Sequence, residues 1–183
     1  LKAFSVVAEA LQRSKRRHVI SLSNGTPIRY FQLFDGMNYS ACYCNRGVSG
    51  IDGSTSTAIG TTIGIADIIT DAASVLITGD MSFSYDIGAL ATQFIPDNFK
   101  IIVLNNSGGG IFRFIPSTAR LPQLEQYFAV NPGIKIDKLA EAYEFTHFIA
   151  NSQEQLEDVI DRFLSHEHKA ILEIVTPPDV SGE

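Results

Sequence analysis

The chain has 183 residues, of which 45% are apolar and 19% are charged, a composition typical of a globular domain with a sizeable core. Fourteen basic residues against 20 acidic ones give a net charge of −6, which argues against a nucleic-acid-binding surface. The apolar runs fall short of the roughly 20 residues that a membrane helix needs, and no signal peptide is recognisable. We therefore expect a cytoplasmic protein, and the start at Leu1 within an expected helix indicates a fragment of a longer chain.

Short Val- and Ile-rich runs alternate along the chain with segments of helical periodicity. The helical spacing of Phe4, Val7, Ala8 and Leu11 opens the series. The expected strands cover residues 18–23, 41–45, 74–79, 100–105, 146–150 and 170–176. The expected helices between them cover residues 27–34, 53–72, 84–94, 136–145 and 152–166, the first with Thr26 as N-cap and Pro27 at its first position.

This alternation predicts a three-layer α/β/α fold, in which helices cover both faces of a six-stranded, mostly parallel sheet. No internal linker or repeat interrupts the pattern, so residues 1–183 are expected to form a single domain. The longest irregular stretch, residues 108–131, is predicted to be a functional or mobile loop.

Polar, glycine-containing segments follow the first four strands. They comprise residues 24–25, 45–53, 79–84 and 105–112. Because ligands of open α/β sheets bind beyond the carboxyl ends of the strands, we expect all four segments at one edge of the molecule.

Asp80 stands between an expected strand and an expected helix, beside backbone amides that favour an anion. A carboxylate and a bound anion can lie side by side if a cation binds between them. Mg²⁺ typically takes one or two carboxylates together with phosphate oxygens. Asn106 and the carbonyl of Gly108 offer further oxygen ligands, so the pattern predicts a metal-bound diphosphate. The alternative for Asp80 is a helix cap. Neither the G-x-G-x-x-G spacing nor a P-loop is present.

The cysteines and histidines do not have the spacing of a metal site. Cys42 and Cys44 are expected to be reduced core thiols. We assign no chemistry to the four histidines, His147 included.

Three blocks carry a resemblance to a known family. Gly79-Asp80 and Asn105-Asn106 resemble the GDG…NN motif of thiamine diphosphate enzymes, with Met81 in place of its last glycine. The runs "CNRGVSGIDGSTSTAIG" and "NNSGGGIF" are similar to the C-terminal domain of the MenD family, the 2-succinyl-5-enolpyruvyl-6-hydroxy-3-cyclohexene-1-carboxylate (SEPHCHC) synthases of menaquinone biosynthesis. The resemblance covers about residues 18–176.

The resemblance implies the thiamine diphosphate-binding fold and a set of cofactor ligands. Asp80, Asn106 and the Gly108 carbonyl would bind Mg²⁺, with Mn²⁺ as the alternative ion. The diphosphate would meet the amides of Ser82 and Phe83. The pyrimidine side of the cofactor would lie near Ser49, and Ile51 would bend it into a V shape; the alternative for Ile51 is a core residue.

The resemblance also implies a transferase that decarboxylates 2-oxoglutarate and adds the resulting carbanion to isochorismate. Both substrates are anionic, so Arg29 and Arg46 would recognise them, unless they are ordinary surface arginines. Ile111 and Phe112 would form an apolar wall, or simply pack. Gly25 stands where a serine is common in the family.

No catalytic residue is assigned to this chain, because the activating glutamate of such enzymes comes from another domain. Asp52 and Asp86 are interpreted as helix-terminus residues. We expect that glutamate on the pyrimidine-binding domain of a partner subunit, in a homodimer or homotetramer, and we expect the isolated fragment to be inactive. The alternatives are another thiamine diphosphate-dependent 2-oxo acid decarboxylase or synthase, such as an acetolactate synthase relative, or a non-catalytic binding domain of the same fold.

Overall fold

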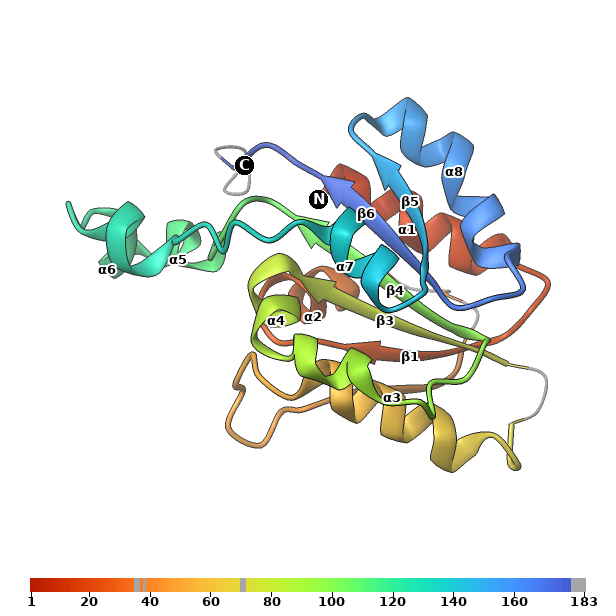
Figure 1. The fold of residues 1–183 in the computed structure, drawn as a ribbon. Coiled ribbons are helices and arrows are strands. Elements are labelled where there is room, and N and C mark those ends of the chain that lie inside the picture. Colours follow the sequence, from red (N-terminus) through yellow and green to blue (C-terminus); the bar gives the residue numbers. More distant parts are fainter. Residues whose placement is uncertain (35–36, 38, 70–71, 179–183) are drawn as a thin grey trace.

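In the computed structural model, which describes residues 1–34, 37, 39–69 and 72–178, six strands form one sheet in which all neighbouring strands are parallel (Figure 1). The order across the sheet is β2-β1-β3-β4-β6-β5. The strands are β1 (His18–Leu22), β2 (Tyr39–Cys44), β3 (Ala73–Gly79), β4 (Phe99–Asn105), β5 (Thr146–Ala150) and β6 (Ala170–Val175). The expected six-stranded sheet is therefore confirmed, and it is wholly parallel.

Helices cover both faces of the sheet. One face packs against α1 (Lys2–Arg13), α2 (Thr26–Phe31) and α8 (Gln153–Ser165). The other face packs against α3 (Ser54–Ile65), α4 (Asp80–Tyr85), the short 3-10 helix η1 (Ile87–Ala91) and α7 (Ile136–Ala142). Figure 1 shows α1 and α8 together on one side of the sheet and α3 on the opposite side.

The central strands are buried on both faces, which explains their unbroken apolar sequence. On β4, Ile102 and Leu104 pack toward α1 and α8, whereas Ile101 and Val103 pack toward α3 and α7. Each such side chain contributes about 1.5–3 kcal/mol by leaving water. The edge strands β2 and β5 are only partly buried, and the free thiols of Cys42 and Cys44 lie half-buried on β2 rather than deep in the core.

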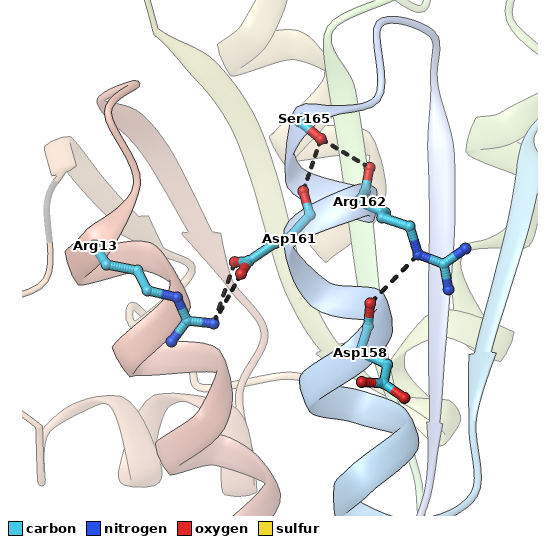
Figure 2. A network of polar contacts seen from close by, with 5 residues as sticks. All are labelled: Arg13, Asp158, Asp161, Arg162 and Ser165. Carbon is cyan, nitrogen blue, oxygen red and sulfur yellow. Dashed lines mark hydrogen bonds and ion pairs between the residues drawn. The ribbon is translucent and has the colours of Figure 1, made fainter.

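The α1–α8 contact is mainly apolar, with an ion pair at its rim. Figure 2 shows Arg13 of α1 reaching Asp161 of α8, and their Nη2 and Oδ1 atoms are 3.2 Å apart. Both side chains are about half-exposed, so the pair adds at most about 1 kcal/mol. Ser165 and Arg162 donate hydrogen bonds to backbone carbonyls within α8 itself.

Three local expectations are wrong. Thr26 is the first residue of α2 rather than its cap, because Gly25, with a positive φ of 98°, makes the turn out of β1. The helix after β3 begins at Asp80, not at Ser84, because the chain turns directly out of the strand at Gly79. Residues 108–131 are not irregular throughout.

That segment, called the arm below, contains three short helical turns: α5 (Ile111–Phe114), α6 (Pro116–Ala119) and the π-helical turn η2 (Leu124–Phe128). Turns of four or five residues are too short to show a helical period in the sequence. Figure 1 shows the arm extending away from the sheet. Within the described ranges, none of the helices is long and apolar enough to cross a membrane.

Candidate functional site

The carboxyl ends of the parallel strands meet at one edge of the sheet, as expected. The segment after β1 is joined there to the segment after β2 by Asn24, which is only 4% exposed. Its Nδ2 donates to the carbonyls of Asn45 and Gly50, both at 2.7 Å, and its Oδ1 accepts from Nη1 of Arg46 at 2.6 Å. Asn24 was expected at this edge, but no role for it was predicted; its position after a buried strand was the available signal.

The segment after β2 is joined in turn to α4. The Ser82 hydroxyl donates to the carbonyl of Ile51, and Ser82 and Phe83 are both buried. Just beyond α4, Oδ2 of Asp86 accepts hydrogen bonds from the backbone N–H and the hydroxyl of Ser56, at 2.7 and 2.6 Å. Asp86 therefore serves the first turn of α3, which confirms its interpretation as a helix-terminus residue.

Asp80 joins α4 to the turn that follows β4. Its side chain is buried, at 2% exposure. Oδ1 accepts from the N–H of Met81 at 2.9 Å, and Oδ2 accepts from the N–H of Gly108 at 2.8 Å. Asp80 and Gly108 therefore lie close together, as expected, although Asp80 contacts the N–H of Gly108 and the expected metal ligand is the carbonyl of Gly108.

Burial raises the pKa of Asp80 to about 6. The hydrogen bonds that its carboxylate accepts from backbone N–H groups act in the opposite direction and lower the pKa. Within the described residues, no Lys, Arg or His forms an ion pair with it. A bound cation would compensate this buried charge. Carboxylate, amide and backbone carbonyl oxygens are the ligands that Mg²⁺ and Mn²⁺ prefer, so Asp80, Asn106 and Gly108 fit such an ion.

The turn after β4 requires glycine because it lies against the arm. Ser107 and Gly108 have positive φ angles of 60° and 140°. A Cβ on Gly108 would lie 2.7 Å from the carbonyl oxygens of both Ala129 and Val130, which is closer than a real carbon can approach. The end of the arm is therefore packed closely against Gly108, one of the candidate metal ligands.

The remaining candidates are Ser49, Arg29, Ile111 and Phe112. Ser49 is exposed and has a positive φ of 56°. Arg29 is exposed on α2. Ile111 and Phe112 are partly buried at the start of the arm, where the Phe112 ring packs edge-to-face on Phe128 with 5.4 Å between ring centres. The hydrogen bonds described above do not include these four residues, so their roles remain predictions.

One polar cluster was not predicted from the sequence; it lies on the face of the sheet covered by α7. Oε1 of Glu173 accepts from Nδ2 of Asn105 at 2.7 Å, and Oε2 lies 3.3 Å from Nε2 of His147. The hydrogen bond from His147 is the main cause that lowers the pKa of Glu173. The signal available in the sequence was a lone carboxylate within an otherwise apolar strand.

The chain is similar to known proteins over most of its length. Residues 23–174 match the family model described as thiamine pyrophosphate enzyme, C-terminal TPP binding domain. SEPHCHC synthases from Christiangramia forsetii and Flavobacterium johnsoniae are 41% and 40% identical to this chain, each over 96% of it. The synthase from Porphyromonas gingivalis is 38% identical over 97% of it. The chain spans about 30% of the length of these curated relatives.

A solved structure has the same fold. The benzoylformate decarboxylase of Polynucleobacter necessarius superposes on 96% of this chain, and on 32% of its own, with a TM-score of 0.78. At 16% identity this likeness concerns the fold alone.

Proposed function

Because this chain belongs to the family of C-terminal thiamine pyrophosphate-binding domains, we propose that it is the cofactor-binding domain of a SEPHCHC synthase. Such a synthase would be a transferase of menaquinone biosynthesis that decarboxylates 2-oxoglutarate and joins the remaining carbon skeleton to isochorismate. The observation that carries the proposal is the buried carboxylate of Asp80, which links the start of α4 to the turn after β4 and, among the described residues, accepts hydrogen bonds from the backbone N–H groups of Met81 and Gly108.

Different residues of the chain would bind different parts of the cofactor. Asp80, Asn106 and the Gly108 carbonyl would hold Mg²⁺ or Mn²⁺. The amides of Ser82 and Phe83, in the first turn of α4, would hold the diphosphate. When bound, thiamine diphosphate supplies the carbon nucleophile and the electron sink that decarboxylation of a 2-oxo acid needs.

Two residues of the segment after β2 would shape the middle of the cofactor. Ile51 would support its bend, and Ser49 would lie beside the pyrimidine ring. The hydrogen bond from Ser82 to the Ile51 carbonyl supports this role, because it fixes the support to the diphosphate-binding helix.

Substrate recognition would fall to arginines. Arg46 lies at the sheet edge, and its bond to buried Asn24 holds one side of its guanidinium in place. Arginine binds carboxylates through a planar pair of donors, which suits a dicarboxylic 2-oxo acid. Arg29 would take the second anionic substrate, with Ile111 and Phe112 as the apolar wall.

The metal assignment is tested by calorimetry of thiamine diphosphate binding. We expect binding that depends on Mg²⁺, and that Asp80→Ala abolishes this dependence because the cation loses its carboxylate. Asp97→Ala is the matched control, since Asp97 is exposed just before β4, at the opposite edge of the sheet. Equal cofactor affinity with and without Mg²⁺ would exclude the assignment.

The role of Arg46 is tested by kinetics of the full-length synthase. We expect Arg46→Ala to lower kcat/KM for 2-oxoglutarate about 10- to 150-fold, which corresponds to one lost charged hydrogen bond, while thiamine diphosphate affinity stays near that of the unmodified enzyme. Unchanged kinetics for both substrates would remove Arg46 from the substrate site.

A further inference from the structure

Glu173 occupies an unusual position for a carboxylate. It lies in β6, between the cross-strand neighbours Val103 and Ile149, and it is only 9% exposed. A carboxylate in such a place is costly to desolvate, and an apolar residue would pack between these neighbours without that cost. Its partners, His147 and Asn105, come from the strands on either side of it. The three side chains therefore form a row across the sheet that ends at the turn after β4.

Asn105 connects this row of side chains to the turn after β4. While its Nδ2 is held by Glu173, its Oδ1 accepts from the backbone N–H of Ser107 at 3.1 Å. Ser107 has a positive φ of 60°, a conformation that residues with a Cβ adopt at a cost. The Asn105 amide thus stabilises a strained turn, and Glu173 sets the direction in which that amide points.

The turn positions the candidate metal ligands. Asn106 lies between Asn105 and Ser107, and the next N–H, that of Gly108, donates to Asp80 at 2.8 Å. A cavity of about 560 Å³ is lined by Asn105 itself and by Ser107, His147 and Glu173, among others. Without its bond to Glu173, the Asn105 side chain would have room to turn within this cavity and release the turn.

We propose that Glu173, supported by His147, is a positioning residue that acts through Asn105 to hold Asn106 and Gly108 in the geometry that binds the divalent cation. The proposal rests on the proposed function, since it concerns the same metal site. It assigns Glu173 no contact with the cofactor or the substrate.

The test measures Mn²⁺ affinity by electron paramagnetic resonance, with thiamine diphosphate present, in the full-length synthase. We expect Glu173→Ala to weaken Mn²⁺ binding about 10- to 100-fold, the usual effect of removing a residue that orients a metal ligand. Glu173→Gln should stay within about threefold of the unmodified enzyme, because its amide oxygen can still accept from Asn105. Leu172→Val is the matched control: Leu172 is the neighbouring residue of β6 and faces the opposite core.

A double-mutant cycle separates positioning from general weakening of the fold. If Glu173 acts through Asn105, combining Glu173→Ala with Asn105→Ala should weaken Mn²⁺ binding no more than Asn105→Ala alone. Additive losses, an equal loss in Leu172→Val, or a loss in Glu173→Gln as large as in Glu173→Ala would each overturn the proposal.

Asp80→Ala distinguishes this proposal from the one on which it rests. If the unmodified enzyme binds no Mn²⁺ with the cofactor, or binds it as well after Asp80→Ala, the proposed function fails. If Asp80→Ala abolishes binding while Glu173→Ala leaves it unchanged, only the positioning role fails.

Discussion

At the scale of single residues, the buried polar groups of this protein differ in how many hydrogen bonds they make. Asn24, Asp80 and Glu173 are each held by two or more hydrogen bonds near the carboxyl edge of the sheet. His18, at the start of β1, is fully buried, and neither of its ring nitrogens has a hydrogen-bond partner in the part of the chain that the structure describes. The charged form of this histidine is therefore disfavoured by the fold.

His18 should make the protein sensitive to mild acid. Burial, aided by nearby Arg16, lowers the pKa of His18 from 6.5 to about 4. Between these two values the unfolded chain binds a proton that the folded chain does not. The free energy of unfolding therefore has its full value, as far as His18 is concerned, above pH 6.5, and it falls as the pH drops toward 4. We expect the loss in the free energy of unfolding that is due to His18 to be about 3 kcal/mol, since one pKa unit corresponds to about 1.36 kcal/mol.

The measurement is the free energy of unfolding in urea between pH 7.5 and pH 4, for the unmodified protein and for His18→Leu. Contributions of the carboxylates, including Asp80, are common to both proteins and cancel in the difference. The variant should lose less stability on acidification, and parallel pH profiles would contradict the argument.

At the scale of elements, the α1–α8 contact shows which interactions hold the helices on the sheet. Leu11 of α1 and Phe163 of α8 are fully buried in the same core, whereas Arg13 and Asp161 meet at the exposed rim. Apolar burial is worth more than an exposed ion pair, because solvent and salt screen the pair.

We expect Leu11→Ala to lower the free energy of unfolding by about 2–5 kcal/mol, through lost burial and the cavity that remains. Arg13→Ala, two residues further along the same helix, should cost less than about 1 kcal/mol. Chemical denaturation of both variants decides the matter; an equal or larger loss for Arg13→Ala would show that the ion pair dominates.

At the scale of the whole molecule, the parallel topology gathers the functional segments at one edge, and the arm extends beyond the sheet (Figure 1). Large apolar side chains are exposed on the arm, namely Phe114, Ile115, Leu121, Tyr127 and Val130. Of the carboxylates at this edge, Asp80 is engaged with the turn after β4, and Asp86 with α3. From the family resemblance, we expect the activating glutamate to come from the pyrimidine-binding domain of a partner subunit.

This 183-residue chain by itself should therefore fold and hold thiamine diphosphate with Mg²⁺, yet have no synthase activity. Folding is expected because both faces of the sheet are covered by helices of the chain itself. The measurement is carbon dioxide release from 2-oxoglutarate, with isochorismate present, by the purified chain and by the full-length synthase. Comparable turnover would place the catalytic acid within this chain.

The amino-acid sequence by itself determined the alternation of strands and helices, the parallel sheet and the order of the Asp80 and Asn106 blocks. These features depend on local periodicity and on motifs of a few residues, which are legible in a single chain. The chain order of the blocks also placed them at one edge, because parallel strands all end there.

Only the tertiary structure decided which side chains meet. Asn105 and Glu173 are 68 residues apart, and their contact depends on the register of β4 against β6, which no local pattern specifies. The Asn24–Arg46 bond likewise needs β1 and β2 paired side by side. The helical turns of the arm could not be recognised in the sequence because each is only four or five residues long, about one helical period, so no repeat can show. The close packing of Gly108 against Ala129 and Val130 is a contact between residues about 20 positions apart, which no local pattern specifies.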